Sequence, residues 1–529
     1  MRKIFIPLAT ILSFGLMLLT VSCTDSLEET NINPNSPSMS DITSFGLFNN
    51  ANKALMNASR GDFSSGRIAL PWMQYSAQKN YTEEDRFQYR VETGNSFFTD
   101  HYLVAQDFKT IIDLNTNPAT AAANSAYGNT DNQIAAARIM LAYTFCQLTD
   151  AFGDIPYYSY GNSDPDFQAL ALDRGILKPK YASQEKIYTD LMKELKEASE
   201  MIVLGDVVFT NGDYVFGSAE KMKKFANSLR LRIANRVKAV IPAANGHIAD
   251  AIASGVMDSN SDTVGLQFEN TDVFPSPFYV SFFIRNRNDF AITNTFVDLL
   301  KGDLGVFGLD PRLQKYAAPI TASKADVRDN NYVETADLTQ YRGMPYGITS
   351  AQAASQKPNT SLWSSNVLKK DYTEILMEYA EVEFLLSENN AWDNTHFQNG
   401  VQASMERWGV DPADITAFIG TLPAANQANV MNQKYIALFM QPYEAWAEYR
   451  RTGFPDTLLQ PGGTYAANNP LPGGALVYTF NALNGLSDLP TRIKYPTNSA
   501  QLNGVNYNAA VANMGGADNL ETKLIWDIN

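Results

Sequence analysis

The stretch MKKFANSLRLRIANRVKAV at residues 222–240 decides the fold class. Its apolar residues Met222, Phe225, Leu229 and Ile233 follow one another at intervals of three and four, and most intervening positions are polar. This period places the apolar side chains on one face of an α-helix. The sequence therefore predicts an amphipathic helix over 218–240.

The same period recurs in four other segments: 133–152, 183–204, 371–388 and 428–452. Ser183 is expected to cap the N-terminus of the second of these helices, because its hydroxyl can accept from a free backbone N–H. Asp371 and Glu374 have the spacing of a capping box at the start of the third. Pro442 lies inside the fourth, where it predicts a kink.

Several predicted helices are neighbours in sequence, and each has a single apolar stripe. Such helices must stack on one another to bury their stripes, as they do in α-solenoids. Long segments rich in Gly, Pro, Asn and Tyr lie between them: 60–95, 153–182, 257–292, 302–365 and 455–520. Loops of this length in a compact domain are usually functional. We expect a mostly α fold in which helical pairs support long irregular loops.

The N-terminus has the layout of a secretory signal. Arg2 and Lys3 precede the uncharged apolar run 4–21, and Cys23 follows at the expected cleavage point. A cysteine there indicates a lipoprotein signal over 1–22, a flexible tether over 23–38 and one domain over 39–529. The alternative is a membrane helix, but the run is shorter than the ~20 apolar residues that span a bilayer.

The overall composition excludes several classes of protein. The chain has 529 residues, with 41 Lys and Arg against 56 Asp and Glu, so its net charge is −15. Nucleic-acid binding needs a basic face, so this balance argues against it. The two cysteines allow no disulfide framework. The three histidines lie far apart in sequence, so we expect no metal site and no cofactor.

Signatures of the common catalytic sites are absent: the sequence has no GxSxG, HExxH, P-loop or CxxC motif. Cys146 falls on an apolar helix and is expected to be a buried thiol. Glu374, Glu378 and Glu381 would share one side of a helix, a spacing that would also suit a glycosidase pair. We favour a solvated face with partners for arginine. The basic residues of 218–240 are likewise expected to pair internally.

Aromatic residues in the irregular segments are the stronger functional signal. A flat ring can stack on the apolar face of a sugar, while Asn or Arg binds its hydroxyl groups. Three segments combine these types, and from them we select the candidate ligand-binding residues Trp72, Tyr75, Tyr81, Phe278, Tyr279, Phe282, Arg285, Asn286, Tyr341, Arg342, Tyr346 and Trp363. The alternative is that each ring packs its loop against the helices.

Several motifs, in order along the chain, resemble those of the SusD-like (RagB/SusD) family, most closely its SusD-like 2 branch. They are AFGDIPY at 151–157, PKYASQEKIY at 179–188, KFANSLRLRIA at 224–234, DPRL at 310–313, EYAEVEFLLSE at 378–388 and EAWAEYRRTG at 444–453. Ala182 departs from the aspartate that is usual in the second motif. Together the motifs run over most of the chain.

The resemblance implies a TPR-like helical scaffold with a loop-built ligand face. It also implies a non-catalytic lipoprotein of the Bacteroidota outer membrane, lipidated at Cys23, exposed at the cell surface and held by its lipid alone. Such a protein captures glycan, or peptide as in the RagB branch, for a SusC-like TonB-dependent transporter. Two other classes stay open: a secreted all-α glycoside hydrolase, and a TPR-like protein adaptor without a small ligand.

Overall fold

The computed structural model describes residues 41–471 and 474–528. Residues Ser44–Asn529 form one compact unit. The predicted signal peptide, the tether and Cys23 lie outside the described residues. Within the described residues, no helix combines the length and the apolar character that a bilayer crossing requires.

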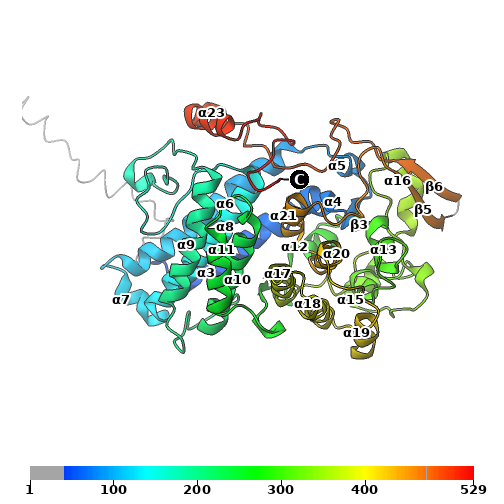
Figure 1. Ribbon diagram of the computed structural model, residues 1–529, viewed down its shortest axis with the longest axis horizontal. Coiled ribbons are helices and arrows are strands. Elements are labelled where there is room, and N and C mark those ends of the chain that lie inside the picture. Colours follow the sequence, from blue (N-terminus) through cyan, green and yellow to red (C-terminus); the bar gives the residue numbers. More distant parts are fainter. Residues whose placement is uncertain (1–40, 472–473, 529) are drawn as a thin grey trace, which may run out of the picture. The chain divides into compact units, whose positions relative to one another are not determined.

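The long helices of the first half lie side by side, each against the next along the chain (Figure 1). They are α3 (Ser44–Arg60), α6 (Val91–Thr116), α8 (Thr130–Phe152), α9 (Gln184–Met201), α10 (Ala219–Val237) and α11 (Ala244–Ala253). The apolar stripe of α10 is fully buried in this stack. Helical pairs therefore bury their stripes against their neighbours, as the sequence predicts.

A second group of helices follows α10, and α17 packs directly against it. This group comprises α17 (Tyr379–Asn389), α18 (Asn394–Arg407), α19 (Pro412–Ile419), α20 (Gln427–Ala437) and α21 (Pro442–Thr452). Most of the other helices are short and lie in the long connecting segments. They are α4 (Leu70–Trp72), α5 (Thr82–Asp85), α7 (Ala121–Asn124), α12 (Pro277–Tyr279), α13 (Asn294–Lys301), α14 (Arg312–Tyr316), α15 (Lys324–Asp329), α16 (Ser350–Gln356), α22 (Ser499–Leu502) and α23 (Gly504–Asn513).

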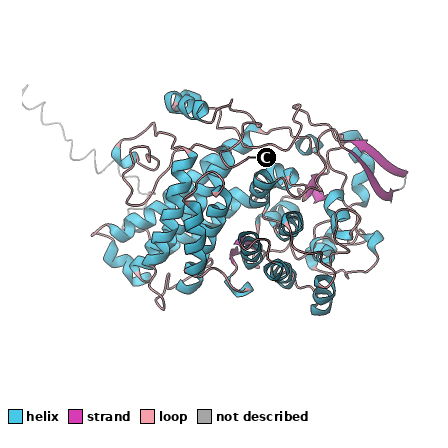
Figure 2. Cartoon of the chain, viewed as in Figure 1, coloured by secondary structure: helices cyan, strands magenta, loops and turns pink. Residues whose placement is uncertain are grey.

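Three small antiparallel sheets hold these segments together (Figure 2). Their strands are β1 (Ser76–Gln78) with β3 (Phe290–Ile292), β2 (Val264–Gln267) with β4 (Thr373–Met377), and β5 (Thr464–Leu471) with β6 (Gly474–Thr479). The sequence analysis predicts none of these strands. They are short, and two of the pairs join residues more than a hundred positions apart, so no local pattern identifies them.

The helices predicted over 133–152, 183–204 and 218–240 are confirmed as α8, α9 and α10. Ser183 caps α9 as predicted, because its hydroxyl accepts from the backbone N–H of Lys186. Ser218 does the same for α10. Local capping and the apolar stripe thus agree with the final packing.

Two helix predictions are wrong in detail. The helix predicted over 371–388 begins only at Tyr379, because the residues before it pair with β2 as strand β4, so no capping box forms at Asp371. The helix predicted over 428–452 is two helices, α20 and α21. Pro442 starts α21 instead of kinking a continuous helix, since a first-turn residue needs no intrahelical N–H partner. Met440, with φ of 68°, turns the chain between them.

Candidate functional site

Pairing of β1 with β3 brings together two of the segments that carry candidate residues, 60–95 and 257–292. Ser76 lies opposite Ile292, and Gln78 lies opposite Phe290. The loops that flank these strands share one surface, which we call the aromatic–arginine face. It consists of Asp62, Phe63, Arg67, Tyr81, Ile284, Arg285, Asn286 and Arg287. The side chains of Phe63, Tyr81 and Arg285 are 52%, 38% and 59% exposed.

The guanidinium groups of this face lie beside its rings. Arg67 lies over the ring of Phe63, with its Cζ 4.2 Å from the centroid. Arg287 lies 5.6 Å from the ring centroid of Tyr81 and donates to the Tyr81 hydroxyl at 3.3 Å. Cation–π contacts of this kind fix a ring and leave its other side free. The face therefore presents flat apolar surface next to charged hydrogen-bond donors.

The loop that carries Arg285 is held on both sides by polar contacts. Ser281 donates to Asp62 at 3.0 Å, and Arg285 lies 3.8 Å from the same carboxylate. Asn286 has φ of 56°, a left-handed conformation that asparagine tolerates better than most residues. Its side-chain oxygen accepts from Lys324 of α15 at 2.6 Å. These contacts hold the loop in place before any ligand arrives.

Eight of the twelve candidate residues lie in the core instead. They are Trp72, Tyr75, Phe278, Tyr279, Phe282, Tyr341, Tyr346 and Trp363. The ring of Tyr75 stacks on Tyr435 with centroids 4.6 Å apart, and its hydroxyl donates to the Tyr435 carbonyl oxygen. The ring of Trp363 meets that of Phe278 edge-on at 5.0 Å. These rings pack the loops against the helices, which is the alternative raised from the sequence.

The exposed part of the candidate set is smaller than predicted. Tyr81, Arg285 and Asn286 belong to the aromatic–arginine face, while Arg342 is half-buried and donates to the Thr339 carbonyl oxygen. The sequence analysis missed Phe63, although it follows a Gly–Asp pair that is typical of an exposed turn. Segment 302–365 contacts the face through Lys324, which donates to Asn286, whereas its candidate aromatic residues are buried.

The acidic residues that would suit a glycosidase do not share a face. Glu374 points into the interior from β4, where burial raises its pKa to about 8 and Arg60 only partly opposes the shift. Glu378 pairs with Arg407 at 2.5 Å. Glu381 also pairs with an arginine and is buried. The expected arginine partners are confirmed for Glu378 and Glu381 but not for Glu374, whose carboxylate oxygens have no hydrogen-bond partner among the described residues. The expected solvated face is wrong.

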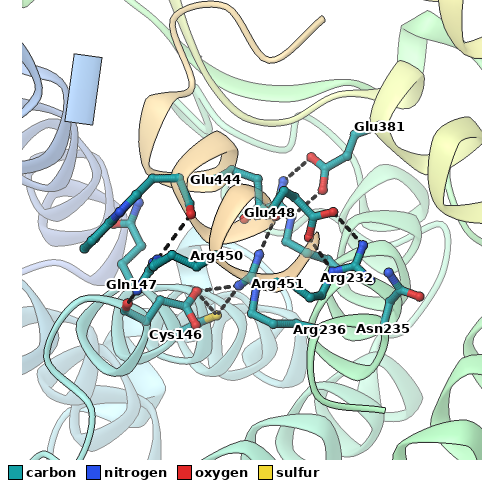
Figure 3. A network of polar contacts seen from close by, with 12 residues as sticks. Cys146, Gln147, Arg232, Asn235, Arg236, Glu381, Glu444, Glu448, Arg450 and Arg451 are labelled. Carbon is teal, nitrogen blue, oxygen red and sulfur yellow. Dashed lines mark hydrogen bonds and ion pairs between the residues drawn. The ribbon is translucent and has the colours of Figure 1, made fainter. Parts of the chain in front are cut away.

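A buried network of ion pairs joins α8, α10, α17 and α21 (Figure 3). Arg236 donates to both Asp150 and Glu444, and Arg232 pairs with Glu381 at 2.5 Å. The internal pairing predicted for the basic residues of 218–240 is therefore confirmed in part. Lys224, Arg230, Arg232, Arg236 and Lys238 pair with carboxylates, whereas Lys221 and Lys223 form no ion pair among the described residues. Cys146 is buried beside this network, and burial raises the pKa of its thiol well above the usual value. A protonated, inaccessible thiol is a poor nucleophile.

Comparison with known protein families agrees with this architecture. A family model described as "Starch-binding associating with outer membrane" matches residues 34–474. The chain belongs to the SusD-like family. A second SusD-like model, described as "Susd and RagB outer membrane lipoprotein", matches residues 424–527. Neither description names a catalytic activity.

Solved structures with the SusD-like fold match nearly the whole chain. A protein titled "chitin-binding protein" is 23% identical, with a TM-score of 0.71, and the match covers 92% of this chain and 100% of that one. A chitin-binding SusD homologue from Flavobacterium johnsoniae is 21% identical, with a TM-score of 0.67 and coverages of 92% and 98%. A SusD homologue from Bacteroides uniformis is 22% identical, with a TM-score of 0.69 and coverages of 91% and 99%.

These structural matches confirm the mostly α, TPR-like helical-pair fold. At this level of identity they establish the fold alone. A sequence search of curated proteins finds no match to this SusD-like chain.

Proposed function

We propose that the protein is a non-catalytic surface lipoprotein that binds a nutrient glycan on the aromatic–arginine face. The glycan is then delivered to a SusC-like TonB-dependent transporter in the outer membrane. The observation that carries the proposal is the face itself, where two exposed rings each lie beside an arginine and a third arginine, Arg285, is exposed, in a SusD-like chain. The starch-binding description of the family and the chitin-binding titles of two structural relatives support a carbohydrate ligand.

The chemistry of the face suits a sugar. Phe63 and Tyr81 offer flat surfaces on which the C–H face of a pyranose ring can stack. Arg285 extends into solvent beside them, and its guanidinium can donate to sugar hydroxyl groups. A protein that must release its cargo binds it weakly, so we expect a dissociation constant in the micromolar range or higher, about −8 kcal/mol or less favourable.

Peptide capture is the second candidate, because arginine and aromatic side chains also suit carboxylates and apolar side chains. The description of the second family model includes RagB, the branch for which the sequence analysis considered a peptide ligand. A secreted glycoside hydrolase is disfavoured, because Glu378 and Glu381 are already occupied by arginine partners.

A combined glycan and peptide array, probed with the full-length protein, tests the proposal. We expect binding to one class of neutral oligosaccharide, with no shortening of the bound glycan on prolonged incubation. Release of smaller sugars would show a hydrolase. Binding to peptides alone would assign the face to the second candidate.

A further inference from the structure

A second recess lies away from the aromatic–arginine face, where β4 meets the C-terminal end of α18. Its volume is about 320 Å³, and Lys221, Lys369, Arg407, Asn260, Thr373 and Trp408 contribute to its wall. This volume is at the lower end of the range for small-molecule sites. It is large enough for one sugar residue or a small acid.

The charge of this wall is unusual for so acidic a chain. Among the described residues that line it, three are cationic and none is a carboxylate. Lys221 and Lys369 form no ion pair with any residue that the structure describes. Arg407 is paired with Glu378, with Nε 2.5 Å from the carboxylate, and its Nη2 is closed off from solvent. The two lysines are therefore the cationic groups that stay available to a ligand.

The two carboxylates whose charges act on Lys221, Asp262 and Asp213, have other partners. Asp262 and its neighbour Asp258 both bind Lys224 at 2.9 Å, and Asp213 accepts from three backbone N–H groups of the loop that follows it. Glu406 accepts from Asn260 at 3.2 Å and from Gln402 at 2.7 Å. The positive groups of the recess are thus not neutralised by direct contact with these acids.

The amine of Lys221 is partly buried in the wall. Burial lowers its pKa, and the charges of Asp262 and Asp213 oppose that shift only in part. An anion in the recess would oppose it further.

We propose that this recess binds the carboxylate or sulfate group of a small acidic ligand, such as an acidic sugar. Lys221 and Lys369 supply charge-assisted hydrogen bonds to the anion. The hydroxyl of Thr373 can bind the neutral part of the ligand. The recess shares no residue with the aromatic–arginine face. It gives this acidic chain a local cationic site for an anionic group.

Isothermal titration of the full-length protein at low ionic strength tests this site with three probes: glucuronate, glucose and inorganic sulfate. We expect glucuronate to bind at least tenfold more tightly than glucose. The double variant Lys221→Gln/Lys369→Gln should weaken glucuronate binding at least tenfold. The control Lys178→Gln changes an exposed lysine that does not line the recess and should leave binding unchanged.

The three probes distinguish a site for an acidic sugar from a site for a free oxyanion. Sulfate that binds as tightly as glucuronate, with the same dependence on the two lysines, assigns the site to a free oxyanion. Weaker sulfate binding assigns it to an acidic sugar. Equal affinity for glucose and glucuronate, or glucuronate binding that the lysine variant leaves unchanged, overturns the proposal. Neutral-glycan binding on the aromatic–arginine face is read in a separate titration, so either proposal can fail alone.

Discussion

Replacement of Glu388 by glutamine tests a buried cluster of ion pairs that joins α17, α21 and the residue that follows α10. Glu388 on α17 is only 6% exposed, and both of its carboxylate oxygens lie 2.8 Å from Arg451 on α21. Lys238, just after α10, donates to it at 3.0 Å. Glu388→Gln keeps the size of the side chain and removes its charge, so it isolates the electrostatic contribution.

The pKa of the Glu388 carboxyl gives the size of the expected loss in the free energy of unfolding. Burial alone would raise it, but Arg451 and Lys238 outweigh burial and hold the pKa of Glu388 at about 2, below its ordinary 4.5. A tenfold change in acid dissociation is worth about 1.4 kcal/mol, so the folded state favours the charged form by about 3 kcal/mol. We expect Glu388→Gln to lower the free energy of unfolding by about this amount at pH 7.

The stabilisation that the Glu388 charge provides should decrease as the pH falls. Because the pKa in the folded state lies below that in the unfolded state, the stabilisation is complete above the unfolded value and is lost as the pH falls towards the folded one. The difference between parent and variant should shrink from about 3 kcal/mol at pH 7 to about half of that at pH 3. Urea unfolding of both proteins at the two pH values measures it.

A matched control is Glu200→Gln, which removes an exposed carboxylate whose closest lysine is 3.7 Å away. Such surface pairs contribute about 0–1 kcal/mol, so this variant should unfold nearly as the parent does. A cost below about 1 kcal/mol for Glu388→Gln at pH 7, or a cost that does not change between the two pH values, would refute the reasoning.

Two further predictions concern the core and the anchor. Trp363→Ala should lower the free energy of unfolding by about 3–5 kcal/mol, since it removes a fully buried ring from a cluster with Phe278 and Phe290. Urea unfolding measures this change. A loss below about 1 kcal/mol would show that the ring is not part of the core. Cys23→Ala should release the protein from the outer membrane in cell fractionation; if the variant partitions as strongly as the parent, a lipid on Cys23 is not the anchor.

The helical scaffold could be predicted because its determinants are local. The residues of the α10 stripe lie within a few turns of one another, and Ser183 caps α9 within its first turn. Both features agree with the final packing. Glu374 could not be placed, because the residues after it suit a buried strand as well as a helix. Its strand partner, β2, is about a hundred residues earlier in the chain.

The candidate site was predicted only in part, for a different reason. Composition shows that a loop contains aromatic residues, but not which of them the loop buries in its own core. Trp72 and Tyr75 fill such a core, while Tyr81, a few residues later, remains exposed. Pairing between distant segments decides this, as when β1 and β3 bring Tyr81 beside Arg287.

The central claim is that the aromatic–arginine face binds the glycan. The most direct measurement is the affinity of the full-length double variant Phe63→Ala/Tyr81→Ala for the glycan that the array identifies. Because each stacked ring contributes more than about 1 kcal/mol, we expect binding to weaken at least tenfold. The control Tyr214→Ala removes a ring that is 51% exposed on the loop before α10 and should bind as the parent does. A double variant with the affinity of the parent would contradict the account.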